Sequence, residues 1–578
     1  MSSINLFYRR AMWVFIPLSI FTFSCNTSKT FSIITPHKTV MAPKAVVSSA
    51  NAFSSKVGID ILQQGGNAVD AAIAVQFALA VVHPTAGNIG GGGFMVYRSG
   101  DGKDVSTLDF REKAPAKSTR DMYLDAQKNV MPNKSTKGHL AAGIPGTVDG
   151  CAKMYSKYSQ LKNWQKLLQP AIDLAEKGYP ITEAEAMRLN KEKLTFLTYN
   201  TQPTAFVKAD TTVLWQRGDI LKQPDLAKTL TLIRDKGAAG FYEGETADKI
   251  VAEMQRGGGI ISKDDLKSYQ ATWRKPLFGT YRGYNIQTMP PPSSGGIALL
   301  QLLGTVEKYP LSNYGFHSVE ATHLFVEAER RVYADRAEHL GDADFYKVPI
   351  DKLLKPSYIL DRFKTFDKDH ATPSKDVKAG DMNAVSEQTT HISIVDASGT
   401  AVSITTTLND SYGSRTVVGG AGFILNNEMD DFSVKPGVPN LYGAIGGEAN
   451  SIVPNKRPLS SMTPTIVTKD GKLFMVVGTP GGTTIITSVF QVITNVIDFN
   501  MSATEATHAR RFHSQWLPDM VFVEKDAFAK DITDRLTMMG HIIKERGTIG
   551  AVETIMVRSD GTLEGVADNR GDDDVRGY

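Results

Sequence analysis

The chain has 578 residues, which is too long for one ordinary hydrophobic core, so we expect several domains or one large layered unit. Its hydrophobic fraction of 42% and charged fraction of 22% are typical of a soluble globular protein. A formal charge of only +3, with no basic stripe in the sequence, argues against nucleic acid as a partner.

The N-terminus has the pattern of an export signal. An Arg9-Arg10 pair precedes an apolar run over 11–24 that is too short to span a bilayer comfortably. The run ends at Cys25, in a context that resembles a bacterial lipobox, although Thr22-Phe23-Ser24 departs from the usual Leu-Ala-Gly type. We therefore expect residues 1–25 to be a signal peptide and the protein to be periplasmic or secreted, with lipidation of Cys25 as an open alternative to a soluble mature form.

The first part of the mature chain is predicted to be helical. Residues 54–64 have helical spacing, and Asn67 is a suitable N-cap for a second helix over 68–82 that is apolar on nearly every side and therefore buried. The glycine-rich run 87–94 contains no Gly-Lys-Ser/Thr and leads into a strand over 94–98. It predicts tight backbone packing and no nucleotide site.

Helical segments dominate from 160 to 275, and a further helix is predicted over 297–308. The helix predicted over 317–336 carries several charges, which favours a solvated face. Residues 361–388 are polar with little apolar periodicity, which is typical of a linker.

After Thr389 the sequence changes to strands joined by tight turns, with helices between them. This texture predicts an α+β layered unit. The predicted hairpins pair 389–395 with 401–408, 465–468 with 473–477 and 554–558 with 563–566, and the predicted helices cover 484–498, 502–511 and 527–539.

The first hairpin begins with two adjacent threonines. A symmetric turn centred on Ser398 places Thr389 opposite Thr407, with Asn409 just beyond on the same face, unless a bulge shifts the register. Thr390 then points to the other, apolar face with the isoleucines. The simplest interpretation is structural, because cross-strand threonine pairs stabilise sheets.

The alternative interpretation is an N-terminal nucleophile. A threonine hydroxyl needs a neighbouring base, and a free α-amino group with a pKa of about 7.7–8.0 is such a base. An internal threonine has no free amine, so the chain must first be cut before it. Attack of the Thr389 hydroxyl on the carbonyl of Gln388 would give an ester that water then hydrolyses.

The sequence resembles the bacterial γ-glutamyltransferases (γ-glutamyltranspeptidases), which are N-terminal nucleophile hydrolases. The resemblance rests on the segments 82–94, 109–112, 290–296, 389–391, 426–432, 457–462 and 478–482, which occur in the order of the family. It implies a four-layer αββα sandwich. It also implies self-cleavage between Gln388 and Thr389, giving a large subunit of residues 26–388 and a small subunit of residues 389–578 that form a heterodimer.

The resemblance also assigns catalytic roles. Thr389 matches the nucleophile, and Thr407 matches the threonine that hydrogen-bonds it. Gly481 and Gly482 match the backbone N–H pair of the oxyanion hole, where glycine permits close approach. Tyr442 matches the aromatic cover of a lid loop, for which an ordinary surface loop is the alternative.

The substrate-binding roles carry over in the same way. Arg111 matches the arginine that binds the α-carboxylate, which suits the bidentate fork of a guanidinium. Asn409, Glu428 and Asp431 match the residues that gather the α-amino group, and the pair Ser460-Ser461 matches further carboxylate contacts. Each position alone has a structural alternative, but together they match both charged ends of a γ-glutamyl group.

The implied activity is hydrolysis of glutathione and other γ-glutamyl compounds, or transfer of the γ-glutamyl group to amino-acid or dipeptide acceptors. Eleven histidines show no His-Glu-x-x-His pattern, so neither a metal nor another cofactor is expected. Two rivals stay open: a glutaryl or cephalosporin acylase of the same fold, and a non-catalytic envelope lipoprotein that uses the fold as a binding module.

Overall fold

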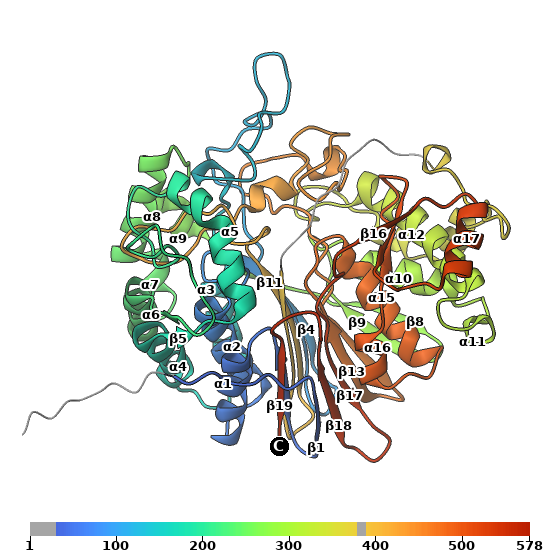
Figure 1. The fold of residues 1–578 in the computed structure, drawn as a ribbon, viewed down its shortest axis with the longest axis horizontal. Helices are drawn as coiled ribbons and strands as arrows, with labels where there is room; N and C mark the ends of the chain where they lie inside the picture. The colour runs from blue at the N-terminus through green and yellow to red at the C-terminus, as the bar shows by residue number, and fades with distance from the viewer. Residues whose placement is uncertain (1–30, 378–388) are drawn as a thin grey trace, which may run out of the picture.

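The computed structural model describes residues 31–377 and 389–578 (Figure 1). The predicted signal peptide 1–25 with Cys25, and Gln388 at the predicted cleavage site, lie outside the described residues.

Two antiparallel sheets of seven strands form the centre of the molecule. In order across the sheet, the first consists of β1 (Thr39–Ala42), β18 (Leu563–Ala567), β17 (Glu553–Val557), β13 (Lys472–Gly478), β12 (Thr465–Lys469), β9 (Tyr284–Thr288) and β8 (Leu277–Tyr281). The second consists of β19 (Asp574–Gly577), β2 (Val46–Ser49), β10 (Thr390–Val395), β11 (Ala401–Thr407), β3 (Gly92–Arg98), β4 (Val105–Asp109) and β7 (Thr272–Arg274). Smaller sheets join β14 (Phe512–His513), β15 (Val521–Glu524) and β16 (Ile543–Arg546), and β5 (Tyr179–Pro180) with β6 (Ile220–Leu221).

Helices cover the outer face of each sheet, on the left and right of Figure 1. One layer contains α1 (Ala52–Gln63), α2 (Ala68–Val82), α3 (Thr147–Tyr158), α4 (Trp164–Lys177), α5 (Glu183–Tyr199), α6 (Pro224–Lys236), α7 (Ala239–Tyr242), α8 (Gly244–Gly257) and α9 (Lys263–Ser268). The other contains α10 (Gly295–Val306), α11 (Leu311–Tyr314), α12 (Val319–His339), α13 (Ile350–Leu353), α14 (Pro356–Arg362), α15 (Thr484–Ile497), α16 (Ala503–His508) and α17 (Lys530–Met538). The predicted four-layer αββα sandwich is confirmed.

Three apolar clusters hold the layers together. One joins α1 and α2 to the apolar face of β10 and β11, and a second joins α10, α12 and α15 to β9, β12 and β13. A third, smaller cluster lies between the sheets and includes Val46, Val96, Val476 and Ile555. The order helix, sheet, sheet, helix therefore follows from which face of each strand is apolar.

The predicted hairpin register is also confirmed. Thr390 pairs with Thr406 and His391 with Thr405, without a bulge. Thr390 lies on the face that packs against the helices. On the polar face, which turns toward the other sheet, His391 contacts Thr405 of the neighbouring strand β11 at 2.8 Å.

The glycine-rich run is a close-packing element, as predicted. A Cβ atom on Gly91 would lie 2.1 Å from the carbonyl oxygen of Thr407. Asn88 in the same run donates from its side chain to that carbonyl oxygen at 2.8 Å. The run thus fixes the end of β11, where Thr407 lies.

The prediction of a solvated face for the helix over 317–336 is wrong. In α12 the charged side chains of Glu327, Glu329, Arg330 and Arg331 are all buried. Glu327 pairs with Arg330 and Arg331 within the helix itself. Arg330 also pairs with Asp519, and Glu329 accepts from the backbone N–H of Ser514, so segments remote in sequence cover these charges. The tract predicted to be a linker is described as far as Val377, and within it Thr365 and Thr372 contact Arg331 of this helix. Residues 378–388 lie outside the described part.

Strands from both sides of the predicted cleavage site alternate within each sheet. β10 and β11 lie between β2 and β3, and β12, β13, β17 and β18 lie between β1 and β9. Separating residues 389–578 from the rest would therefore break backbone ladders in both sheets.

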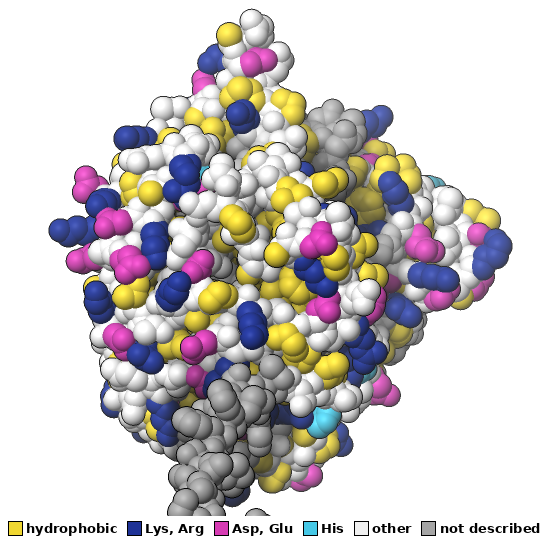
Figure 2. Space-filling view, turned by 60° about the vertical axis from the view of Figure 1, so that its left-hand side comes forward, with side chains coloured by type: hydrophobic (Ala, Val, Ile, Leu, Met, Phe, Trp, Pro, Cys, Tyr) yellow, Lys and Arg dark blue, Asp and Glu magenta, His cyan; other side chains and the backbone are white. Residues whose placement is uncertain are grey.

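Lys and Arg side chains are interspersed with Asp and Glu on the face shown in Figure 2. Such mixing gives that face no large field of a single sign. None of the helices within 31–377 and 389–578 is long and apolar enough to cross a membrane.

Candidate active site

The candidate site lies where four strand ends of the second sheet meet. β10 begins and β11 ends at this edge, and β3 begins and β4 ends beside them, because the strands are antiparallel. Thr389 directly precedes β10, Thr407 ends β11, and Arg111 follows β4 by two residues. The sheet thus brings together residues far apart in sequence.

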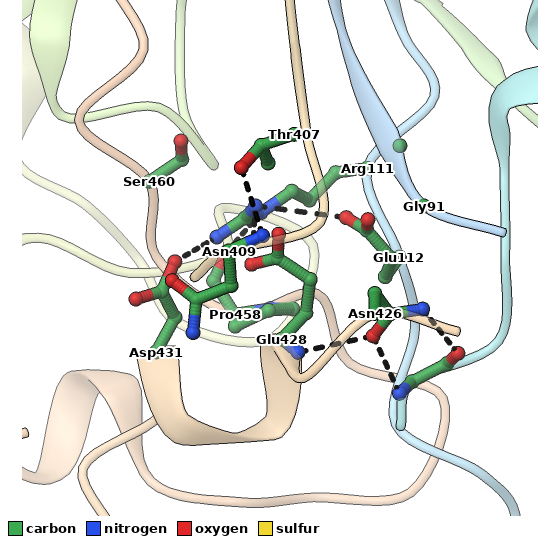
Figure 3. A network of polar contacts seen from close by, with 12 residues as sticks. Gly91, Arg111, Glu112, Thr407, Asn409, Asn426, Glu428, Asp431, Pro458 and Ser460 are labelled. Atoms are coloured by element: carbon green, nitrogen blue, oxygen red, sulfur yellow. Dashed lines mark hydrogen bonds and ion pairs between the residues drawn. The ribbon is translucent and has the colours of Figure 1, made fainter. Parts of the chain in front are cut away.

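Thr389 and Thr407 face each other as predicted. Their hydroxyl oxygens lie 3.5 Å apart, and both side chains are buried. The Thr407 hydroxyl also accepts a hydrogen bond from the backbone N–H of Asn409 at 2.8 Å, which Figure 3 shows. This contact fixes the Thr407 side chain beside the hydroxyl of Thr389.

Arg111 is the centre of a buried ion cluster (Figure 3). Its NH1 nitrogen lies 2.6 Å from Glu428 and 3.6 Å from Glu112, and its NH2 nitrogen donates to Asp431. Backbone carbonyls of Pro458 and Leu459 accept from Nε at 3.4 Å and NH2 at 3.2 Å. The guanidinium is thus held in one orientation by carboxylates that the resemblance assigns to amine binding.

Burial and charge act against each other in this cluster. Burial alone would lower the pKa of Arg111, but Glu428, Asp431 and Glu112 raise it above its ordinary value. Burial raises the pKa of Glu112 to about 8 and raises that of Glu428 well above its ordinary range. Burial thus favours the protonated form of these two acids, and the charge of Arg111, which lowers their pKa, offsets burial only in part.

Glu112 was not predicted to act in the site, although it lies in the segment 109–112 that carries part of the family resemblance. Neither of its carboxyl oxygens has a hydrogen-bond partner among the described residues, and its side chain is fully buried. Its adjacency to Arg111 in the sequence is the signal that points to it.

Asn409 and Tyr442 link the strand end to the predicted lid loop. The Tyr442 hydroxyl donates to the side-chain oxygen of Asn409, and the Asn409 side-chain nitrogen donates to the carbonyl of Asn427 at 2.9 Å. Asn409 has a φ of 77°, a region that asparagine tolerates better than most residues. Tyr442 is only 5% exposed and lines the same cavity as Thr389.

The hydroxyls of Ser460 and Ser461 have different partners. The Ser460 hydroxyl accepts from the backbone N–H of Met462 at 3.2 Å, and the Ser461 hydroxyl accepts from Arg336 at 2.9 Å. Arg336 also donates to Ser294 at 2.9 Å. Sequence reasoning missed Arg336, which lies on α12, because that helix was expected to face solvent.

Gly481 and Gly482 form the turn that leads into α15. Their φ values are 133° and 49°, which favour glycine. Their carbonyls accept from the backbone N–H groups of Thr484 and Ile485 at 3.0 and 3.1 Å.

One cavity collects most of these residues. It is lined by 22 residues, which include Thr389, Thr407, Arg111, Asn409, Asp431, Ser460, Ser461, Tyr442, Gly482, Arg336 and Thr483. Glu428 and Gly481 do not line it; Glu428 lies behind the guanidinium of Arg111. A threonine hydroxyl, an arginine with an acid beside it, and a glycine turn therefore share one small space.

Comparison with known proteins agrees with this geometry. A family model described as gamma-glutamyltranspeptidase matches residues 54–578. The chain is 47% identical over 543 residues to a glutathione hydrolase proenzyme of Escherichia coli, covering 93% of this chain and 92% of the relative. It is 34% identical to an acylase ACY 1 proenzyme of a Pseudomonas species, covering 93% and 94%.

Solved structures show the same two groups. A cephalosporin acylase from Bacillus halodurans superposes with a TM-score of 0.81 at 26% identity, covering 95% of this chain and 98% of that one. The Helicobacter pylori gamma-glutamyltranspeptidase superposes with a TM-score of 0.56 at 47% identity, covering 60% of this chain and 97% of that one.

Proposed function

The chain belongs to the gamma-glutamyltranspeptidase family, and from this premise we propose that it is a glutathione hydrolase and γ-glutamyltransferase made as a self-cleaving precursor. The observation that carries the proposal is the single cavity in which the Thr389 hydroxyl lies with Arg111 and Asp431. Such a site provides a nucleophile for an acyl group and charges of both signs for the α-carboxylate and α-amino group of a γ-glutamyl compound.

Precursor cleavage comes first. The Thr389 hydroxyl attacks the carbonyl carbon of Gln388, the C–N bond breaks, and the acyl group moves from nitrogen to oxygen. Water then hydrolyses the ester, leaving a carboxylate on Gln388 and a free α-amino group on Thr389. Residues 26–388 and 389–578 stay together as a heterodimer, a prediction supported by the alternation of their strands in both sheets.

Catalysis then uses the new amine. The Thr389 hydroxyl, having given its proton to its own α-amino group, attacks the γ-carbonyl carbon of the substrate. The backbone N–H groups of Gly481 and Gly482 stabilise the oxyanion, and the leaving amine departs with the proton. Water or the amine of an amino acid or dipeptide then resolves the γ-glutamyl ester on Thr389.

Substrate binding requires Arg111 to exchange partners. In this structure Asp431 occupies its NH2 nitrogen, while Ser460 and Ser461 line the same cavity. We propose that the α-carboxylate takes the place of the Asp431 carboxylate on Arg111 and contacts both serines. Asp431 then binds the α-ammonium together with Asn409, supported by Glu428.

An acylase that acts on glutaryl groups is the second candidate, because the chain is also similar to a cephalosporin acylase and to an acylase ACY 1 proenzyme. A glutaryl group has a carboxylate but no amine, so it would leave Asp431 without a cation in the cavity. The higher identity to glutathione hydrolases than to the acylase also favours γ-glutamyl substrates.

We also propose that the protein is exported to the periplasm or secreted, since residues 1–25 resemble a signal peptide. Anchoring by a lipid on Cys25 is the alternative to a soluble mature form. Mass determination of the mature large subunit separates the two, because lipidation retains Cys25 and adds acyl chains.

The test compares hydrolysis of γ-glutamyl and glutaryl anilides by the purified protein, with Thr389→Ala as the control. We expect release of the aniline from the γ-glutamyl compound by the wild type and none above background by Thr389→Ala. Preference for the glutaryl compound would favour the acylase, and full activity of Thr389→Ala would overturn the nucleophile assignment.

A further inference from the structure

The last described residues before the cleavage site are held by a tryptophan that lies after it in the sequence. The indole N–H of Trp516 lies within hydrogen-bonding distance of two carbonyl oxygens, 3.0 Å from that of Ser374 and 2.8 Å from that of Val377. Residues 378–388 then lead to Thr389. One buried donor, on a side chain that is 2% exposed, thus bridges both ends of the short helical turn at 374–376.

The same turn has further contacts with the segment around Trp516. The backbone N–H of Ser374 donates to Asp519 at 2.7 Å, and the Ser374 hydroxyl donates to the carbonyl of Trp516 at 2.6 Å. Arg330 on α12 donates to both Ser374 and Asp519. Residues from both predicted subunits therefore fix this turn.

Helix α12 holds the chain just upstream. Arg331 donates to the hydroxyls of Thr365 and Thr372 at 3.0 and 3.1 Å, and Glu327 accepts from the backbone N–H of Thr372 at 3.1 Å. His323 Nε2 donates to the carbonyl of Asp367 at 2.7 Å. The buried charges of α12 thus serve to bind the segment 365–374.

His323, Glu327 and His541 form a group whose ligand atoms lie within 4.8 Å of one another, as metal ligands do. However, the Glu327 oxygens already accept from Arg330 at 3.2 Å and Arg331 at 2.6 Å. The two imidazoles contact each other directly, at 2.7 Å between His323 Nδ1 and His541 Nε2. These contacts favour a hydrogen-bonded anchor over a cation site.

We propose that Trp516 is a positioning residue for precursor cleavage. The attack of Thr389 on the preceding carbonyl requires a near-attack geometry, which becomes rarer as the chain before it gains conformations. Strand β10 fixes the chain after Thr389, and the Trp516 contacts fix it at Val377. Releasing the second anchor gives the chain before the nucleophile more unreactive conformations and lowers the reactive fraction.

The inference rests on the proposed self-cleavage. Trp516 is expected to affect the rate of cleavage and not the activity of the cleaved enzyme. Trp516 does not line the cavity that holds Thr389. Once the Gln388–Thr389 bond is broken, the anchor no longer constrains the reacting atoms. Loss of the indole N–H should therefore slow maturation and leave the mature enzyme unchanged.

The experiment follows conversion of pulse-labelled full-length chain into its two fragments, made by cell-free synthesis, on a denaturing gel. We expect Trp516→Phe, which keeps an aromatic side chain and removes the N–H, to slow conversion about 5- to 10-fold, the effect of about one lost hydrogen bond. The kcat/KM of fully converted enzyme for a γ-glutamyl anilide should equal that of the wild type.

The matched control is Trp164→Phe. Trp164 is also buried, and its indole N–H donates to one carbonyl, that of Ile233, at 2.9 Å, but in the large subunit between α4 and α6. We expect it to convert at the wild-type rate. Ser374→Ala is a second test that leaves the Trp516 side chain in place and removes the contacts of the Ser374 hydroxyl with the Trp516 carbonyl and with Arg330, with slowing expected in the same direction.

Wild-type conversion rates in both Trp516→Phe and Ser374→Ala would overturn the positioning role while leaving the proposed cleavage intact. Equal slowing in Trp164→Phe and Trp516→Phe would overturn it too, because the effect would then be general destabilisation. A wild-type chain that never converts would instead overturn the proposed cleavage, and this inference with it.

Discussion

Asp431 offers a test of how the site distinguishes a γ-glutamyl group from a glutaryl group. We predict that Asp431→Asn selectively impairs γ-glutamyl substrates. Asp431 lines the cavity and pairs with Arg111, whereas its neighbour Asp430 is bound by Ser135 at 2.7 Å and by the backbone N–H of Leu441 at 2.8 Å. Only Asp431 is therefore placed to receive the substrate ammonium.

The magnitude follows from the contact that is lost. A hydrogen bond to a charged group contributes about 1.5–3 kcal/mol, so the kcat/KM for a γ-glutamyl anilide should fall about 10- to 150-fold. A glutaryl anilide has no ammonium to lose. Because the substitution also loosens the hold of residue 431 on Arg111, the kcat/KM for the glutaryl compound should equal or exceed the wild-type value.

The assay measures kcat/KM for both anilides on enzyme that has fully converted to two fragments. Asp430→Asn is the control and should change both values by the same factor, since its contacts stabilise the loop and do not face the substrate. Equal losses for both substrates in Asp431→Asn, or no loss for the γ-glutamyl compound, would refute the assignment of Asp431 to the ammonium.

Three further substitutions test other contacts of the site. Thr407→Val removes the hydroxyl 3.5 Å from that of Thr389 and should slow turnover of a γ-glutamyl anilide about 10-fold, the effect of about one hydrogen bond; an unchanged kcat would contradict this. Tyr442→Phe removes the bond to Asn409 and should raise the KM about 2- to 10-fold with the thermal midpoint unchanged, and an unaltered KM would argue against a lid. Burial raises the pKa of Glu112 to about 8, so stability from its protonated form is present below its unfolded pKa and is lost as pH rises through about 8. Glu112→Gln should therefore flatten the decline in the free energy of unfolding between about pH 5 and 8. Denaturant titration at a series of pH values measures this decline, and a decline as steep as that of the wild type would count against the raised pKa of Glu112.

The parts of the site that depend on strand periodicity could be predicted from the sequence. The alternation of polar and apolar residues in 389–409 fixes which threonine faces Thr407, and a tight turn fixes the register. The buried helix over 68–82 was equally predictable, because its composition leaves no polar face.

The partners of buried charges could not be predicted in this way. Arg336 looked like a solvated charge because its acceptors, Ser294 and Ser461, lie 42 and 125 residues away in the sequence. The pairing of Arg111 with Glu428 and Asp431 was also hidden, because the resemblance assigns these groups to opposite ends of the substrate. Only the fold shows that they contact each other.

The central claim is that Thr389 becomes an N-terminus and acts as the nucleophile. The most direct measurement is the intact mass and N-terminal sequence of the fragments in denatured, purified protein. The account predicts a small fragment that runs from Thr389 to Tyr578 with a free α-amino group, absent from Thr389→Ala. A single uncut wild-type chain, or a small fragment that starts at Thr390 or elsewhere, would contradict it.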